Sequence, residues 1–393
     1  MAHFIRTSVL FVLSACVSIA WAEDGDAIVQ AHLKARGGAA AWAKVNTLQL
    51  EGQFTGFSIT HPFVLQKQRP NKVHMRWTLG DNPMEMGFDG QSAWWSNPWY
   101  GTDWITPMGA VDRGWQRMYH PMATPFFDYK AHGLTMSYKG RGDLDGQEGF
   151  VFEFNGEDGY VETWYLDPDT HLEFARVATG SEFGRPTVQN TWFDDFKKVG
   201  DLVVPHRIES EFHTRHRVLE VEKVTVNPDL GATSFGRPTP EPLKPLMAME
   251  GTWQVSVKQR SSPRQPWDEH QVTSVIHRAL DGQVLQETVA YGKRVPREMF
   301  RQYSYDRSRD RLLIMQTDNY ANNTAILAGA KTEDQWQWDN TKTDSAWKAG
   351  AQTIMDRVTL KELSDTAFKL ECASSRDEGE TWEVHTELSY QRK

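Results

Sequence analysis

The segment Phe235–Pro245 reads Phe235-Gly236-Arg237-Pro238-Thr239-Pro240-Glu241-Pro242-Leu243-Lys244-Pro245 and holds four prolines within eight residues. Proline fixes φ and lacks an N–H, so this segment can neither continue a helix nor sit in a central strand. It predicts a short, stiff, extended linker at 236–245 between two β-rich bodies. A proline-rich loop inside one large domain is the alternative. The length of 393 residues favours the linker, because a single core rarely grows beyond about 250–300 residues.

The charge balance of the chain argues against nucleic acid as its partner. The formal net charge is −9, and no basic tract could follow a phosphate backbone. The chain is rich in tryptophan (16) and methionine (13). These large apolar side chains serve both cores and binding surfaces.

The N-terminus predicts an export signal over residues 1–22. Arg6 supplies the positive charge, Thr7–Ile19 is mostly apolar, and Ala20-Trp21-Ala22 fits a small-x-small cleavage site. Leu13-Ser14-Ala15-Cys16 resembles the lipobox of bacterial lipoproteins, so an anchor through a lipidated Cys16 is the alternative. Because apolar sequence continues past Cys16, we expect export to the periplasm without an anchor.

The first body, 23–235, changes from helical to strand periodicity. Ile28, Val29, His32 and Leu33 share one face of a helix predicted over Asp24–Gly38. Apolar residues then alternate with polar ones at Leu48, Leu50 and Phe54, at Val73, Met75 and Trp77, at Met84, Met86 and Phe88, at Leu134, Met136 and Tyr138, and at Phe150, Phe152 and Phe154. This pattern is typical of antiparallel strands with one apolar face. It predicts a curved sheet, with a helix at Val111–Tyr119 on its concave side.

Several short motifs carry a resemblance over Asp24 to Pro238. They are Asp26-Ala27-Ile28-Val29, Gly37-Gly38, Ala41-Trp42, Leu48-Gln49-Leu50-Glu51-Gly52, Phe88-Asp89-Gly90 with Trp94, Tyr165-Leu166-Asp167-Pro168-Asp169-Thr170, Val204-Pro205-His206-Arg207-Ile208 and Val226-Asn227. In this order they resemble the periplasmic LolA/LolB-type lipoprotein-sorting proteins. The resemblance implies a mainly β fold, an unclosed antiparallel β-barrel with a few covering helices. It also implies a cavity that holds a lipid or lipoprotein acyl chains.

The apolar strand faces and the predicted helix supply the candidate ligand-binding residues. These are Trp77, Met84, Met86, Phe88, Trp94, Trp115, Met118, Met136 and Phe152. Burying cargo against such a surface gains about 25 cal/mol per Å², and methionine adapts to variable shapes. A role as ordinary core is the alternative for each. Contact with a membrane surface is a further expectation for a lipid carrier.

The second body, 246–393, continues the strand pattern. About eight to ten short strands at regular spacing predict a closed barrel or a sandwich. Gly251-Thr252-Trp253 resembles the first strand of lipocalins and other calycins. Ala279–Gln283, Tyr303–Asp306 and Asp377–Trp382 are similar to a bacterial calycin-like family of unknown function. The resemblance implies a calycin-like antiparallel β-barrel, either hollow or filled by its own side chains.

The chain contains none of the common catalytic signatures. Gly-x-Ser-x-Gly, the P-loop and His-Glu-x-x-His are all absent. His213 and His216 would lie on opposite faces of a strand, so no metal is predicted. We expect no catalytic residue and no cofactor. Two alternatives to a carrier remain: a packed envelope protein that binds protein or glycan through exposed loops such as Ser92–Trp104, and an unrecognised hydrolase.

Overall fold

The computed structural model describes residues 24–79, 81–96, 104–109, 121–156, 159–182, 185–212, 215–231, 235–290, 297–319 and 322–393. The fold is mainly β, with 61% strand and 9% helix, as predicted. The chain forms two compact units, and the division is not a single cut, because Met84–Gly109 groups with the C-terminal part. The boundaries at 235 and 246 therefore stay predictions.

Two short helices open the described chain. Helix α1 spans Gly25–Ala35, and the Asp24 carboxylate caps it by accepting from the Asp26 N–H. Its buried face includes Ile28 and Val29, which confirms the predicted amphipathic helix. Helix α2 spans Ala39–Trp42 and buries Trp42. Among the described residues, no helix has the length and apolar character needed to cross a membrane.

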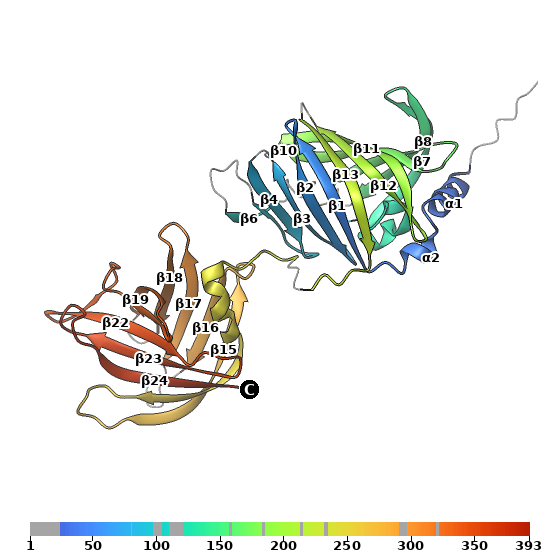
Figure 1. Cartoon of the computed structure of the whole chain (residues 1–393). Helices are drawn as coiled ribbons and strands as arrows, with labels where there is room; N and C mark the ends of the chain where they lie inside the picture. The colour runs from blue at the N-terminus through green and yellow to red at the C-terminus, as the bar shows by residue number, and fades with distance from the viewer. Residues whose placement is uncertain are drawn as a thin grey trace, which may run out of the picture. The chain divides into compact units, whose positions relative to one another are not determined.

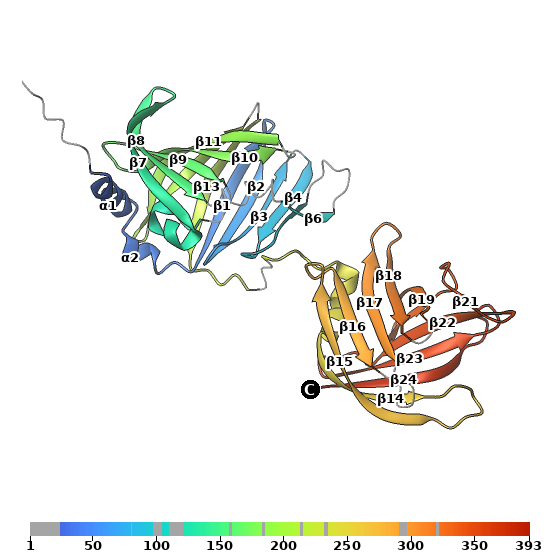
Figure 2. The ribbon, with the colours of Figure 1, turned by 180° about the vertical axis from the view of Figure 1, so that it is seen from behind.

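A sheet of thirteen strands follows in the order β6-β5-β4-β3-β2-β1-β13-β12-β11-β10-β9-β8-β7. The sheet curves strongly but does not close (Figures 1 and 2), as the sequence predicted. The strands are β1 (Thr47–Gly56), β2 (Ile59–Gln68), β3 (Lys72–Leu79), β4 (Asn82–Phe88), β5 (Ala93–Ser96), β6 (Ile105–Pro107), β7 (Leu134–Leu144), β8 (Gln147–Gly156), β9 (Val161–Leu166), β10 (Glu173–Glu182), β11 (Arg185–Val199), β12 (Leu202–Phe212) and β13 (Arg215–Val226).

The predicted alternation places apolar residues on the inner face of this sheet. Strand β1 buries every second residue. Two 3₁₀ helices, η3 (Pro125–Phe127) and η4 (Tyr129–His132), follow the undescribed segment 110–120. Phe126 of η3 packs edge-on against Phe152 and Phe154 of β8. Helix α1, η3 and β8 thus share one core cluster, which holds the helix against the sheet.

The C-terminal sheet closes into an antiparallel barrel of ten strands, because β20 pairs with both β19 and β22. Strand β21 lies at its edge and pairs with β22. The strands are β14 (Gly251–Gln259), β15 (Asp268–Ala279), β16 (Val284–Ala290), β17 (Glu298–Asp306), β18 (Arg311–Asp318), β19 (Thr324–Lys331), β20 (Gln335–Asp339), β21 (Trp347–Ala349), β22 (Gln352–Lys361), β23 (Ala367–Ser375) and β24 (Glu383–Arg392). Large side chains fill the barrel interior, including Trp253, Tyr303, Trp338, Phe368 and Tyr390.

The second half of the proline-rich segment corrects the prediction of an extended linker. Glu241–Met249 forms a 3₁₀ helix, η5. Two prolines are accommodated: Pro242 in the first turn, where a missing N–H costs nothing, and Pro245 further along. Leu243, Leu246 and Met249 are fully buried in the core of the barrel. Glu241–Met249 therefore packs against the barrel core, because its leucines offer apolar area that an extended spacer would leave in water.

Candidate functional site

A cavity of about 80 Å³ lies on the inner face of the N-terminal sheet. Its walls come from the end of α1, from α2, from the segment after residue 120 and from six strands. The lining residues are Arg36, Trp42, Leu48, Leu50, Leu65, Lys67, Pro121, Met122, Ala123, Thr124, Trp164, Glu173, Arg176, Thr191, Phe193, Val204, Pro205, Ile208 and Ser210. The lining is mostly apolar but includes three cationic side chains and one carboxylate.

A polar row crosses four neighbouring strands at the cavity. Arg176 of β10 lies opposite Trp164 of β9 on one side and opposite Thr191 of β11 on the other. Thr191 in turn lies opposite Ser210 of β12. Directly opposed residues share one face of a sheet, and all four line the cavity. The register of the four strands therefore places these side chains next to one another on the inner face of the sheet.

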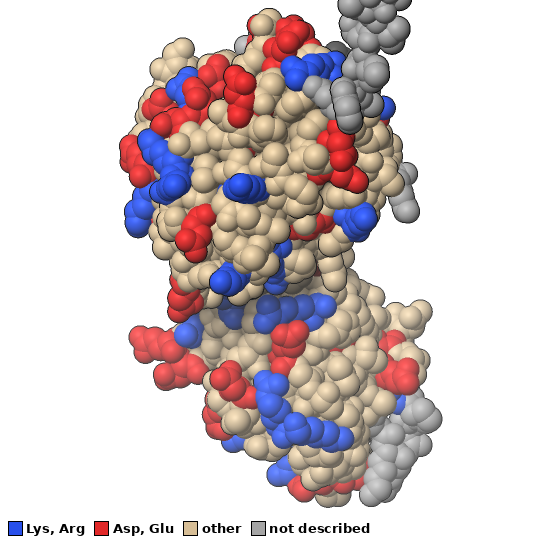
Figure 3. Space-filling model, turned by 90° about the vertical axis from the view of Figure 1, so that its right-hand side faces the viewer, with Lys and Arg blue, Asp and Glu red and all other residues tan. Residues whose placement is uncertain are grey.

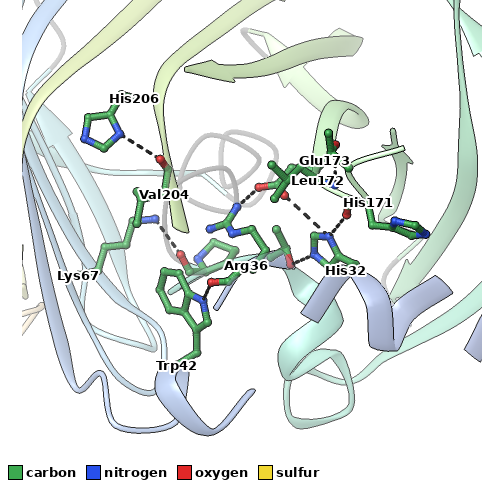
Figure 4. A network of polar contacts seen from close by, with 12 residues as sticks. His32, Arg36, Trp42, Lys67, His171, Leu172, Glu173, Val204 and His206 are labelled. Atoms are coloured by element: carbon green, nitrogen blue, oxygen red, sulfur yellow. Dashed lines mark hydrogen bonds and ion pairs between the residues drawn. The ribbon is translucent and has the colours of Figure 1, made fainter. Parts of the chain in front are cut away.

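A β-bulge adds Glu173 to the same face. The register of β10 against β9 shifts between Glu173 and Ala175, so one extra residue enters the strand. Glu173 and Arg176, three positions apart, then both line the cavity. Glu173 pairs with the Nη1 of Arg36, which follows α1 (Figure 4). Burial raises the pKa of Glu173 and lowers the pKa of Arg36, against their mutual attraction.

His32 of α1 joins this network as a neutral ring. Its Nδ1 lies 2.9 Å from the His171 carbonyl oxygen, and its Nε2 lies 2.9 Å from the Thr124 hydroxyl (Figure 4). A carbonyl only accepts, so Nδ1 carries the proton and Nε2 accepts from Thr124. Burial, reinforced by the positive charge of Arg36, lowers the pKa of His32 to about 3. The ring thus fastens α1 to the turn before β10 and to the segment before η3.

Lys67 of β2 brings a third cation to the cavity. It lies opposite Leu48, and its ammonium donates to the Pro121 carbonyl at 2.8 Å. Its side chain is partly buried. Burial and the charges of Arg36 and Arg176 lower the pKa of Lys67 to about 7. Outside the cavity, acidic and basic side chains lie interspersed on the face that Figure 3 shows, so the cavity differs from that surface in its excess of cations.

Five buried polar atoms of the lining residues have no hydrogen-bond partner within the described part of the chain. They are Arg36 Nε, Trp164 Nε1, Glu173 Oε2, Arg176 Nε and Thr191 Oγ1. Their residues are at most 4% exposed. A buried polar group without a partner costs free energy. Such a set marks the cavity as the best candidate for a binding site.

The predicted ligand-binding residues lie elsewhere. Met84, Met86 and Phe88 of β4 and Trp94 of β5 are buried. Phe152 of β8 belongs to the core against η3, while Trp77 of β3 and Met136 of β7 are partly buried. Trp115 and Met118 fall outside the described residues. None of the seven described candidates lines the cavity, and their part in ligand binding stays a prediction.

The sequence did not single out the residues that the structure brings together. No sequence motif contains the charged residues Arg36, Lys67, Glu173 and Arg176. The one feature that could have pointed to them is their place along the predicted helix and strands. Lys67 follows Leu65 at strand spacing on the face shared with Leu48. Among the described residues, no group of three or more His, Cys, Asp or Glu side chains could hold a metal ion.

No protein-family model matches the chain, and neither does any curated protein. Solved structures do resemble part of it. A LolA-superfamily protein from Nitrosomonas europaea is 11% identical with a TM-score of 0.38, over 53% of this chain and 96% of that chain. A DUF1329 family protein from Desulfovibrio piger is 10% identical with a TM-score of 0.37, over 53% and 96%. A domain from Vibrio parahaemolyticus assigned to outer membrane lipoprotein sorting is 12% identical with a TM-score of 0.36, over 53% and 94%. Membership in the LolA/LolB-type family and the calycin likeness of the barrel stay predictions.

Proposed function

We propose that this chain is a non-catalytic carrier of the bacterial envelope, which binds a hydrophobic ligand such as a lipid or lipoprotein acyl chains on the inner face of the N-terminal sheet. The observation that carries the proposal is the cavity. Leu48 and Leu50 of β1, Leu65 of β2, and Phe193 of β11 supply apolar wall. Each Å² of ligand buried there contributes about 25 cal/mol. The predicted export signal supports a periplasmic location.

The volume of the cavity limits how such a ligand enters. By the same measure a water molecule needs about 10–15 Å³, so 80 Å³ accommodates a headgroup with a few carbon atoms. A longer chain requires the cavity to widen. The segment Pro121–Thr124 forms one wall and contributes no strand, so its displacement costs no sheet hydrogen bonds. We infer that a long ligand enters beside this segment.

The test is to purify the full-length protein from the envelope of a Gram-negative host and analyse an organic extract by mass spectrometry. We expect a co-purified lipid in stoichiometric amount, or, if the cavity is emptied during purification, uptake of a hydrophobic fluorescent dye that fatty acids displace. The mass of the protein should correspond to a chain beginning at Glu23. Neither lipid nor displaceable dye would contradict the carrier function.

A substitution that fills the cavity locates the binding. Leu65 lines the cavity and is 2% exposed, so Leu65→Trp places a larger side chain there and should lower dye uptake severalfold. Val188 of β11 is 57% exposed, so Val188→Trp is the matched control and should bind as wild type. Equal dye uptake by both variants would place the ligand elsewhere on the protein.

A further inference from the structure

The polar part of the cavity has the composition of an anion receptor. We propose that it binds the oxyanion headgroup, carboxylate or phosphate, of a single-chain amphiphile, with Arg176 and Lys67 as the cations and Trp164 and Thr191 as neutral donors. This inference rests on the proposed carrier function and names its ligand class. The same chemistry occurs in fatty acids and in alkyl phosphates.

The unpartnered atoms of the cavity favour an acceptor. Arg36 Nε, Arg176 Nε and Trp164 Nε1 can only donate, and Thr191 Oγ1 can donate. Among these atoms of the described residues, Glu173 Oε2 is the one that can only accept. Oxyanions present several acceptor lone pairs and form charge-assisted hydrogen bonds about twice as strong as neutral ones. A ligand oxyanion would therefore satisfy most of the donors at once.

The charges around the cavity also favour an oxyanion as the ligand. Arg36 is paired with Glu173, so that pair is neutral as a whole. Arg176 has a weaker partner, Glu162, at 3.8 Å from its Nη1. Within the described part of the chain, Lys67 donates to a backbone carbonyl and forms no ion pair, so no described side chain compensates its charge. An anion beside Lys67 would favour its charged form and reverse the lowering of its pKa to about 7.

The apolar walls of the cavity suit the aliphatic chain of an amphiphile. The polar row belongs to β9, β10, β11 and β12, whereas β1 and β2 supply the apolar Leu48, Leu50 and Leu65 beside Lys67. A headgroup at Arg176 can thus continue into an aliphatic chain along the leucines. Inorganic anions would use only the polar half. The ligand that uses both halves is an amphiphile with one charged end.

The test compares four ligands with the same twelve-carbon chain by isothermal titration calorimetry on the full-length protein, below the critical micelle concentrations of the ionic ligands and the solubility limit of the alcohol. The ligands are dodecanoate, dodecyl phosphate, dodecanol and dodecyltrimethylammonium. We expect at least one of the two anions to bind tenfold or more tightly than dodecanol and the cation. The tighter anion identifies the headgroup as carboxylate or phosphate. Equal affinity for dodecanol would overturn the anion receptor but not the carrier, whereas no binding of any ligand would count against both.

Two variants and a control test whether the preference for anionic ligands comes from the cavity. Lys67→Met keeps the length of the side chain and should weaken anion binding about tenfold while leaving dodecanol unchanged. Lys223→Met on β13 is the matched control, because Lys223 is 65% exposed and pairs with Glu51 at the surface; it should bind all ligands as wild type. Arg176→Gln should act as Lys67→Met does, provided that circular dichroism shows it folded. Unchanged anion preference in folded Lys67→Met would refute the proposal.

Discussion

At the scale of single residues, His32 shows how the polar network beside the cavity avoids a further buried charge. The ring is fully buried, and a proton added to Nε2 would reverse the hydrogen bond with Thr124 and place a second buried positive charge near Arg36. Arg36 already pairs with one oxygen of Glu173. The network therefore holds one ion pair and a neutral imidazole, which keeps α1 in place without a further buried charge.

The His32 ring predicts a pH dependence of stability. Its pKa is about 3 in the folded protein and about 6.5 in the unfolded chain. Between these values the unfolded state binds a proton that the native state does not, so stability falls as pH falls, by up to about 1.4 kcal/mol per pH unit. Urea denaturation at pH 7, 6, 5 and 4 measures the slope. His32→Asn keeps an N–H donor near Nδ1 and should show a shallower slope; equal slopes would contradict the assignment.

The charged lining residues could not be predicted from the sequence, for a physical reason at each position. Glu173 and Arg176 are three residues apart, and strand periodicity puts such residues on opposite faces. Only the bulge between Glu173 and Ala175 brings them together. Lys67 stands between Gln66 and Gln68, where a polar strand end is the natural interpretation. Its position inside depends on the curvature of the whole sheet.

At the scale of elements, the predictions that rest on a local pattern of buried residues were confirmed. The conformation of a segment that is set by a distant core was not predicted. Leu48 and Leu50 of β1 and Phe152 of β8 alternate because the sheet has one wet face, and that pattern is local in the sequence. The conformation of Glu241–Met249 is not local. Its prolines are compatible with an extended chain or a 3₁₀ turn, and the apolar interior of the barrel selects the turn by burying Leu243 and Leu246.

Helix η5 should therefore contribute to the stability of the barrel. Leu246 is fully buried in the barrel core, and Leu246→Ala should lower its free energy of unfolding by about 2–5 kcal/mol. Lys244 on the same helix is exposed and pairs with Glu241. Lys244→Ala is the control and should change stability by less than about 0.5 kcal/mol. Guanidinium denaturation of both variants measures the difference; a linker without structural role would give equal values.

At the scale of the whole molecule, the segment after β13 explains why no single position in the chain separates the two compact units. The hydrogen-bond ladders place β4, β5 and β6 in the N-terminal sheet, yet Met84–Gly109 groups with the C-terminal part. Phe235 is buried and its carbonyl accepts from Trp94 Nε1 at 2.9 Å. Arg237 donates to the Ile105 carbonyl at 2.9 Å. The first residues of the proline-rich segment thus complete β5 and β6.

These contacts predict how far the N-terminal sheet extends along the chain. A chain of residues 24–238 should fold and bind dodecanoate within about threefold of the full-length affinity, because all cavity residues lie between Arg36 and Ser210. A chain ending at residue 230 lacks Phe235, whose burial is worth about 3–5 kcal/mol by analogy with Phe→Ala substitutions. It also leaves the Trp94 N–H without its acceptor, so its thermal midpoint should be lower by circular dichroism. If the chain of residues 24–238 fails to fold, β4–β6 require the C-terminal part; if it folds but does not bind dodecanoate, the cavity alone is not the binding site.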